Sequence, residues 1–181
     1  MRMPDAVGRV LLDEETIAAR VGELAAQISA DYADTDDLVL VGMLKGAFIF
    51  LADLARCMTI HHHVDFIALS SYNRGTVTTG AVRLIMDTRA NVTGRHVLII
   101  EDILDTGYTL DYLLRAFTAR GPVSLRTCVL LSKPERRKVE VPVDYLGFEI
   151  PDMWVVGYGL DYADRFRTLP YIGALKREVY E

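Results

Sequence analysis

The sequence predicts an α/β fold with a mostly parallel central sheet flanked by helices. Short apolar runs rich in Val, Leu and Ile alternate along the chain with segments of helical spacing. Several of these runs are apolar at every position, which is typical of strands buried on both faces of a parallel sheet. The chain has 181 residues, of which 51% are hydrophobic and 25% charged, as in one folded globular domain. We therefore expect a single domain over residues 1–181.

The first half of the chain predicts two helices and three strands around a polar segment. Apolar residues recur at helical spacing in residues 14–30, where Ile17, Val21 and Leu24 share one face. The polar residues 70–80 contain two glycines and several threonines, so we expect a flexible loop or a hairpin tip there. Helices are thus expected at residues 14–30 and 47–56, and strands at residues 38–43, 64–69 and 81–86.

The second half predicts one strong strand, one helix and several shorter strands. Residues 97–100 form a compact run of β-branched residues and leucine. The helix expected after it is closed by Gly121 and Pro122. In a parallel sheet, ligands bind beyond the carboxyl ends of the strands, so functional residues are sought there. We expect strands at residues 97–100 and 124–131, short strands or extended segments at 145–148 and 155–159, a helix at 110–120 and a charged loop at 134–138.

Composition excludes several classes of protein. The 20 basic and 25 acidic residues give a formal net charge of −5, which argues against a dedicated nucleic-acid binder. No apolar stretch is long enough to span a bilayer, and we see no secretion signal at the N-terminus. Cys57 and Cys128 are the only cysteines, too few for a disulfide framework, so we expect reduced thiols in a cytoplasmic protein.

Two conspicuous clusters are expected to have no part in the function. The three histidines at residues 61–63 alternate faces on an extended chain and cannot converge on one metal ion, so we expect a solvated turn. The basic residues Arg136, Arg137 and Lys138 are expected to form a solvated loop.

The most informative segment runs from residue 101 to residue 109. A buried strand leads into the carboxylates Glu101 and Asp102, and Asp105 follows shortly before a helix. A helix N-terminus offers unpaired N–H groups and positive potential, and glycine and threonine beside it suit a phosphate. The carboxylates would accept hydrogen bonds from ribose hydroxyls or hold Mg²⁺. Simple capping of the next helix explains one such residue, but not three carboxylates and two threonines within nine positions.

This segment resembles a known signature. Residues 97–110, VLIIEDILDTGYTL, are similar to the phosphoribosyl pyrophosphate signature of the type I phosphoribosyltransferases. Further segments resemble the hypoxanthine (hypoxanthine-guanine) branch of that family, occur in its order and cover nearly the whole chain after the first few dozen residues. These segments are LKG at 44–46, VDF at 64–66 with SY at 71–72, LSK at 131–133, VDYLGFEIPD at 143–152 and VVGYGLDY at 155–162.

The resemblance implies a fold, a reaction and partners. The fold would have a core of about residues 35–140 and a small hood of about residues 141–181 plus the N-terminal segment. The reaction would be purine salvage, in which the 5-phosphoribosyl group moves from phosphoribosyl pyrophosphate to N9 of hypoxanthine, and of guanine. Its products would be IMP or GMP and pyrophosphate, with Mg²⁺ as cofactor. Family members form homodimers or homotetramers, and we expect neither a membrane nor a nucleic acid as partner.

The resemblance also implies a role for each matched residue. Asp105 matches the general base toward the purine imidazole nitrogen, and Glu101 and Asp102 match groups that face the ribose hydroxyls and the metal. The 5′-phosphate would lie within Asp105, Thr106, Gly107, Tyr108 and Thr109.

The remaining matched residues would contact the pyrophosphate, the metal ion and the purine, or close over them. Lys45 and Gly46, in a turn that often has a non-proline cis peptide in the family, and Arg167 match the pyrophosphate contacts. Read by spacing alone, the charged residues among these matches would be ordinary surface residues. The other matches are Asp161 as a metal ligand, Lys133 as the donor to O6, Trp154 and Val155 at the purine, and Ser71 and Tyr72 in a mobile loop that closes over the site.

Two other classes of protein remain as alternatives. A phosphoacceptor signalling domain also has a parallel sheet with acidic strand ends, but it places its acidic pair and its phosphorylated Asp on different strands. A non-catalytic regulator on the same scaffold would bind RNA as well as nucleotide, and the net charge of −5 disfavours it.

Overall fold

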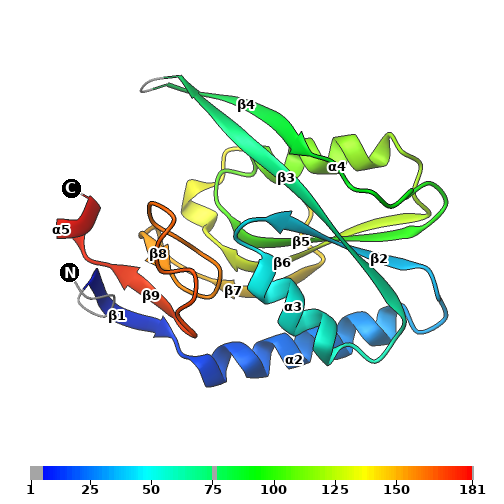
Figure 1. The fold of residues 1–181 in the computed structure, drawn as a ribbon, viewed down its shortest axis with the longest axis horizontal. Coiled ribbons are helices and arrows are strands. Elements are labelled where there is room, and N and C mark those ends of the chain that lie inside the picture. The colour runs from blue at the N-terminus through cyan, green and yellow to red at the C-terminus, as the bar shows by residue number, and fades with distance from the viewer. Residues whose placement is uncertain (1–5, 75–76, 181) are drawn as a thin grey trace.

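The computed structural model describes residues 6–74 and 77–180, and for residues 71–74 and 77–82 it describes only the path of the backbone. The predicted α/β class with a mostly parallel sheet is confirmed, and Figure 1 shows the small second sheet at one side, beside both chain ends. Across the large sheet the strands are β4 (Val77–Met86), β3 (His62–Arg74), β2 (Leu38–Leu44), β5 (His96–Leu104), β6 (Ser124–Ser132) and β7 (Tyr145–Glu149). Across the small sheet they are β1 (Val7–Leu12), β9 (Ile172–Leu175) and β8 (Val155–Val156).

The large sheet reverses its strand order between β2 and β5. Neighbouring strands from β3 to β7 run parallel, whereas β3 and β4 form an antiparallel pair. The chain moves outward from β2 to β3 in one direction and from β5 to β6 in the other. The carboxyl ends of β2 and β5 therefore meet at the edge where ligands bind in open parallel sheets.

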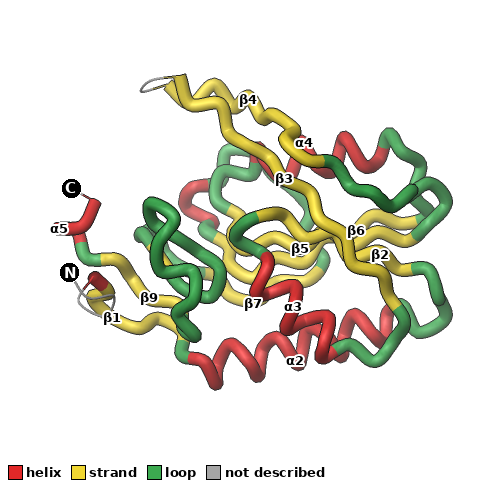
Figure 2. The backbone as a smooth tube through the Cα atoms, viewed as in Figure 1, coloured by secondary structure: helices red, strands yellow, loops and turns green. Residues whose placement is uncertain are grey.

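Helices cover both faces of the large sheet (Figures 1 and 2). On one face lie α2 (Glu14–Asp31) and α3 (Phe48–Cys57), and on the other lies α4 (Tyr108–Thr118). Leu40 belongs to the core under α2 and α3, and its neighbour Val41 belongs to the core under α4. Successive strand residues point to opposite faces, so strands covered on both sides must be apolar at every position.

All three predicted helices are confirmed, with ends shifted by at most two residues. The start of α2 follows from its local sequence. The carboxylate of Asp13 accepts the N–H of Thr16 at 2.8 Å, which satisfies one of the free donors of the first turn. Glu14 and Glu15 add negative charge where the helix dipole is positive.

The strands β3 and β4 form one long hairpin that projects beyond the other strands of the large sheet (Figure 1). Of the two forms predicted for residues 70–80, the hairpin is confirmed, since β3 continues to Arg74 and β4 begins at Val77. Ser71 and Tyr72 lie on the backbone of β3, and their side chains lie outside the described part of the structure. The turn predicted at the histidines is wrong, because His62 and His63 pair with the first residues of β2.

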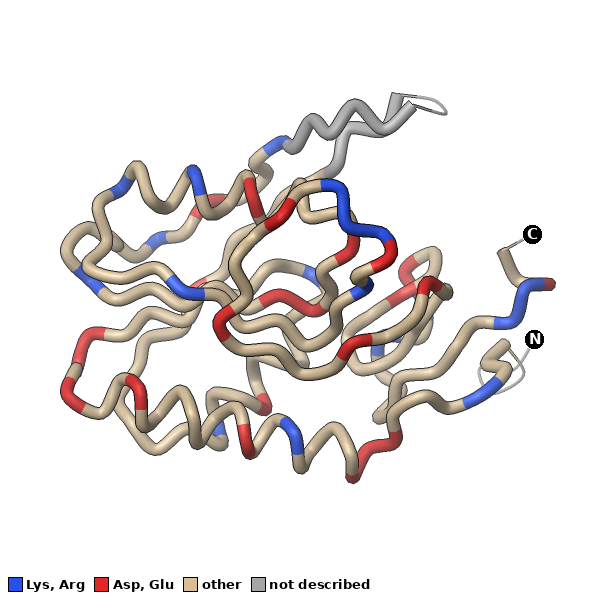
Figure 3. Tube along the Cα trace, turned by 180° about the vertical axis from the view of Figure 1, so that it is seen from behind, with Lys and Arg blue, Asp and Glu red and all other residues tan. Residues whose placement is uncertain are grey.

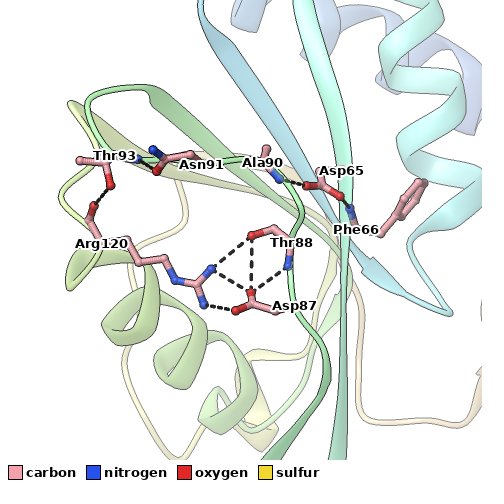
Figure 4. A network of polar contacts seen from close by, with 8 residues as sticks. All are labelled: Asp65, Phe66, Asp87, Thr88, Ala90, Asn91, Thr93 and Arg120. Carbon is pink, nitrogen blue, oxygen red and sulfur yellow. Dashed lines mark hydrogen bonds and ion pairs between the residues drawn. The ribbon is translucent and has the colours of Figure 1, made fainter.

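Two carboxylates fix the chain after the hairpin (Figure 4). Asp65 on β3 accepts the N–H of Phe66 at 2.8 Å and that of Ala90 at 2.7 Å. Arg120 donates to both carboxylate oxygens of Asp87, at 2.8 and 3.1 Å. The end of β4 is thereby tied to the chain that follows α4.

The small sheet joins the two ends of the chain. Its strands β1 and β9 were not predicted, because each pairs with a segment more than a hundred residues away and neither has a long apolar run. The strand predicted at 155–159 stops at Val156, since Gly157 and Gly159 adopt φ of +101° and +100° and turn the chain. The large sheet includes β7 and so extends past residue 141, where we placed the start of the hood. The division into core and hood stays a prediction.

Charged residues of both signs are interspersed along the chain in Figure 3. Over the ranges 6–74 and 77–180, no helix has both the length and the hydropathy to cross a membrane.

Candidate active site

A cavity of about 210 Å³ opens at the carboxyl end of β5. Met43 from β2 lines one side, and the rest of the lining comes from residues 101–110. Parallel pairing brings these segments together, since Gly42 of β2 lies opposite Ile100 of β5. The residues that follow Gly42 and Ile100 on their strands therefore emerge side by side.

Glu101 and Asp102 are buried carboxylates at this cavity. They are only 3% and 8% exposed, and they lie within β5 rather than after it as predicted, because β5 continues its pairing with β6 to Leu104. Burial raises the pKa of Glu101 well above its usual value, and the charge of Asp102 raises it further. Burial also raises the pKa of Asp102. Oε2 of Glu101 has no hydrogen-bond partner among the described residues.

The turn after β2 lies directly against Asp102. The peptide bond between Leu44 and Lys45 is cis. A Cβ atom on Gly46 would lie 1.7 Å from Oδ2 of Asp102, so a side chain at this position would displace the carboxylate. Only glycine lets the backbone of this turn approach the buried carboxylate so closely.

A second loop, residues 157–167, supplies further charges to this turn. Asp164 accepts from Nζ of Lys45 at 3.0 Å, and Arg167 lies 2.7 Å from Asp161 and 3.0 Å from Asp164. The positive charge of Arg167 also acts on Asp102, where it lowers the pKa against the effect of burial. The predicted residues Lys45, Asp161 and Arg167 are therefore brought together, and Asp164 is a member of this cluster that sequence analysis missed.

The residues after β5 form the start of α4. Gly107 has a φ of +92° and precedes the first helical residue, Tyr108. A Cβ atom on Gly107 would lie 2.3 Å from the carbonyl oxygen of Val139, so this position also needs glycine. The helix begins two residues earlier than predicted, which places the N–H groups of Tyr108 and Thr109 in its first turn. Thr106 and Thr109 line the same cavity.

The side chain of Asp105 is held by a residue that sequence analysis set aside. Nε of Arg136 lies 2.7 Å from Oδ1 of Asp105, and Nε of Arg137 donates to the Asp105 carbonyl oxygen at 3.3 Å. Arg136 is exposed, as the solvated loop predicted for this segment implies. It is not a free surface charge, however, because it pairs with Asp105. The run of Arg136, Arg137 and Lys138 after LSK carries no local signal of such a pair.

Lys133 is buried at the end of β6. Its side chain is 9% exposed, and its Nζ lies 3.7 Å from Oδ1 of Asp152. Burial lowers the pKa of Lys133, and the nearby carboxylates of Asp105 and Asp152 oppose that effect. Asp152 also lies 3.5 Å from Nη1 of Arg136, so one carboxylate bridges the lysine and the arginine.

Val155 begins β8 of the small sheet, and Trp154 directly precedes it. Trp154 is 53% exposed, and its ring lies against those of Tyr162 and Tyr180 at centroid distances of 6.0 and 5.8 Å. Val155 is buried in β8. These two ring contacts of Trp154 run to the C-terminal part of the chain, and Trp154 is not among the residues that line the cavity beside Glu101.

The donor set fits Mg²⁺ bound together with a phosphorylated ligand. Glu101 and Asp102 present hard oxygen donors, and Oε2 of Glu101 lacks any partner among the described side chains. The described part of the chain holds no cluster of three or more potential ligands. The two neighbouring carboxylates match the one or two that Mg²⁺ takes when it completes its shell with water and substrate oxygens.

Comparison with known proteins supports one family. A model described as the phosphoribosyl transferase domain matches residues 9–163. The chain is 48% identical to a hypoxanthine-guanine phosphoribosyltransferase of Bacillus subtilis over 99% of both chains. It is 50% identical to a hypoxanthine phosphoribosyltransferase of Escherichia coli over 91% of this chain and 93% of the relative.

Comparison of the fold with solved structures agrees with the sequence comparison. A crystal structure of a hypoxanthine phosphoribosyltransferase from Staphylococcus aureus superposes with a TM-score of 0.94 and 46% identity. The alignment covers 99% of this chain and 97% of that one. The resemblance identified in the sequence is therefore confirmed, and the chain belongs to the family of proteins with a phosphoribosyl transferase domain.

Proposed function

We propose that this enzyme transfers the 5-phosphoribosyl group from phosphoribosyl pyrophosphate to N9 of hypoxanthine, and of guanine. The products are IMP or GMP and pyrophosphate, in a purine salvage reaction that depends on Mg²⁺. The observation that carries the proposal is the juxtaposition of two buried carboxylates, Glu101 and Asp102, with the N-terminus of α4 and with Gly46. The names of relatives at 48–50% identity over more than nine-tenths of the chain favour the same reaction.

The start of α4 binds the 5′-phosphate in this proposal. Backbone N–H groups from Asp105 to Thr109, including those of Gly107 and Tyr108, point toward the anion. The hydroxyls of Thr106 and Thr109 add donors at the same cavity. Glu101 and Asp102 accept from the ribose hydroxyls and hold the metal ion. The partnerless Oε2 of Glu101 supports this role, because a buried acceptor without a donor is costly unless a ligand satisfies it.

The pyrophosphate binds where the Lys45–Gly46 turn meets the loop of residues 157–167. The backbone of Lys45 and Gly46 donates to it, and Arg167 neutralises part of its charge. Asp161 takes part in metal binding from the other side. When bound, Mg²⁺ neutralises charge that develops on the leaving pyrophosphate. Lys45 and Arg167 are already paired with Asp164, so these exposed ion pairs rearrange as the substrate enters.

The purine binds on the side of Asp105, Lys133, Trp154 and Val155. Lys133 donates to the exocyclic O6, a contact that adenine cannot make because it has an amino group there. As the bond between C1′ and the pyrophosphate oxygen breaks and the bond from N9 to C1′ forms, the purine loses a proton. Asp105 accepts that proton from the imidazole ring of the purine. The buried Lys133, beside the carboxylates of Asp105 and Asp152, supports this arrangement.

The hairpin that carries Ser71 and Tyr72 closes over the site and excludes water, which would otherwise attack the same carbon. The enzyme is a homodimer or homotetramer. It is cytoplasmic, which is supported by its two free cysteines, Cys57 and Cys128.

A spectrophotometric assay tests the reaction directly. Purified protein, phosphoribosyl pyrophosphate and Mg²⁺ are mixed with hypoxanthine, guanine, xanthine or adenine in separate reactions. We expect turnover with hypoxanthine and guanine and little with adenine. Failure with all four bases would refute the proposal, and faster turnover with adenine would refute the role of Lys133.

A gel-shift experiment with RNA at moderate salt tests the alternative of a regulator. We expect no retained complex, since basic and acidic residues are interspersed along the described chain (Figure 3). Tight RNA binding in a protein without transferase activity would favour the regulator instead.

A further inference from the structure

Tyr158 occupies an unusual place between the two loops of the pyrophosphate site. It has a φ of +49° and lies between Gly157 and Gly159, which also have positive φ. A residue other than glycine adopts this conformation only where its surroundings hold it there. The side chain is 6% exposed, and its hydroxyl donates to Oδ2 of Asp53 at 2.7 Å.

This hydrogen bond joins the loop 157–167 to the helix that follows the pyrophosphate turn. Asp53 lies on α3, which begins at Phe48, two residues after Gly46. The two segments are 105 residues apart in the sequence. The bond therefore connects the two pieces of chain that carry the pyrophosphate contacts.

The backbone beside Tyr158 makes the contact that positions Arg167. The N–H of Gly159 donates to the Arg167 carbonyl oxygen, and Nη1 of Arg167 donates to the Gly159 carbonyl oxygen, both at 2.8 Å. On the other side, a Cβ atom on Gly159 would lie 2.0 Å from the carbonyl oxygen of Gly46. The position of Gly159 thus fixes where the guanidinium of Arg167 lies and how closely this loop approaches Gly46.

The loops have a second tether of a different kind. Lys45 and Asp164 pair at 3.0 Å, but their side chains are 67% and 68% exposed, and pyrophosphate competes for the lysine. The hydrogen bond of Tyr158 involves no group that the substrate needs. Burial raises the pKa of the Tyr158 hydroxyl, and the bond to Asp53 raises it further, so the hydroxyl remains a donor throughout the assay range.

We propose that Tyr158 is a positioning residue, whose hydroxyl fixes the loop 157–167 on α3 and thereby holds Arg167 at the correct distance from the Lys45–Gly46 turn. This inference rests on the proposed function, because it assigns the loop to pyrophosphate. It concerns the binding of phosphoribosyl pyrophosphate and not the chemistry at the purine.

The variant Tyr158→Phe removes the hydroxyl and keeps the buried ring. Asp53 is not left buried without a partner, since its side chain is 31% exposed, pairs with Arg56 and lines a cavity of about 550 Å³ between α2 and α3. A matched control is Tyr145→Phe, which removes a hydroxyl that donates to Asp31 at 2.6 Å. That pair joins β7 to the end of α2 and contacts neither loop.

Steady-state kinetics separate a positioning role from a structural one. We expect Tyr158→Phe to raise the KM for phosphoribosyl pyrophosphate about three- to tenfold, as the loss of one hydrogen bond predicts. The kcat and the KM for hypoxanthine should stay within about twofold, and Tyr145→Phe should leave all three constants unchanged. Asp53→Asn keeps an acceptor oxygen and should preserve the KM, whereas Asp53→Leu should reproduce Tyr158→Phe.

Thermal stabilisation by phosphoribosyl pyrophosphate with Mg²⁺ provides a second measurement that needs no turnover. Tyr158→Phe should require several-fold more ligand for the same rise in Tm. An unchanged KM and an unchanged ligand requirement would overturn this inference alone, as would an equal effect of Tyr145→Phe. A wild-type enzyme that binds the ligand without turning over any purine would instead overturn the proposed function.

Discussion

Nε of Arg136 lies 2.7 Å from Oδ1 of Asp105, so the carboxylate that we propose as general base is engaged before any purine arrives. The same arginine reaches Asp152, which also lies 3.7 Å from Lys133. Arg136 therefore joins Asp105 to Asp152, and Asp152 in turn lies beside Lys133. We propose that a purine that donates a hydrogen bond to Oδ1 of Asp105 competes with Arg136 for that oxygen.

Replacement of Arg136 should strengthen purine binding. Both partners of the ion pair are more than a third exposed, and such pairs contribute about 0.2–1 kcal/mol. Arg136→Ala should therefore lower the KM for hypoxanthine by up to about fivefold, which initial rates at fixed phosphoribosyl pyrophosphate would measure. Lys138→Ala removes a charge from the same exposed loop and serves as the control. An increase in KM would show that Arg136 binds the purine and does not compete with it.

Replacement of Asp105 tests the proposed base. Asp105→Asn keeps the size of the side chain but cannot accept a proton, so kcat should fall about 10²–10⁴-fold. Because the side chain is 40% exposed, the Tm should change little. Turnover equal to the wild type, in a variant with unchanged Tm, would remove Asp105 from this role.

A methyl group at Gly46 should disturb the buried carboxylate. The added Cβ atom would lie 1.7 Å from Oδ2 of Asp102, so Gly46→Ala must displace either the turn or the acid. We expect the KM for phosphoribosyl pyrophosphate to rise at least about tenfold, which corresponds to about 1.4 kcal/mol. Gly22→Ala is the matched control, because a Cβ atom there meets nothing within 4 Å. A Gly46→Ala enzyme with normal kinetics would contradict the close approach.

The pair of Asp87 and Arg120 should make stability depend on acid pH. Hydrogen bonds from Arg120 lower the pKa of Asp87 below its usual 3.8, so the carboxylate stabilises the fold above that pH. This contribution is lost as pH falls through the lowered, folded-state pKa. Asp87→Asn should lower the Tm at pH 7 by up to about 2–4 °C, since a partly exposed pair contributes at most about 1 kcal/mol.

The difference between Asp87→Asn and the wild type should shrink below pH 3.8 in a series of melting curves. The exposed Asp36 provides a control variant, Asp36→Asn, with little change at either pH. A Tm difference that persisted undiminished under acid conditions would assign the effect to packing and not to charge.

Removal of divalent metal should abolish activity. Glu101 and Asp102 line the cavity where we propose that a polyanion binds, and Asp161 is proposed to hold the same metal ion, while the cations Lys45 and Arg167 are already paired with acids. With excess chelator, we expect less than about 1% of the activity, restored on addition of Mg²⁺. Stabilisation by phosphoribosyl pyrophosphate in melting curves should likewise need Mg²⁺. Full activity in excess chelator would refute the proposed dependence.

Local sequence was sufficient to predict a feature wherever all the residues of that feature lie in one short segment. The helix over residues 14–31 shows its buried face and its cap within its own turns. The carboxylates, threonines and glycine of residues 101–109 are neighbours along the chain, so their joint chemistry could be read directly. Strands that continue past their apolar run were predicted too short, since the polar residues at the end of β5 and β3 are held by pairing with the adjacent strands.

Contacts between residues that are far apart in the sequence could not be predicted from local sequence. Arg136 meets Asp105 across 31 residues, Tyr158 meets Asp53 across 105, and Lys45 meets Asp164 across 119. A single basic or acidic residue looks the same in sequence whether it faces solvent or a partner.

By itself, the sequence determined the fold class, the three long helices and the chemistry of one strand-end segment, because hydrophobic period and adjacent polar groups are properties of neighbours. Only the tertiary structure decided which distant residues share the site. Strand order places Gly46 against Asp102 and brings residues 157–167 onto α3, and these contacts follow from how the strands pair.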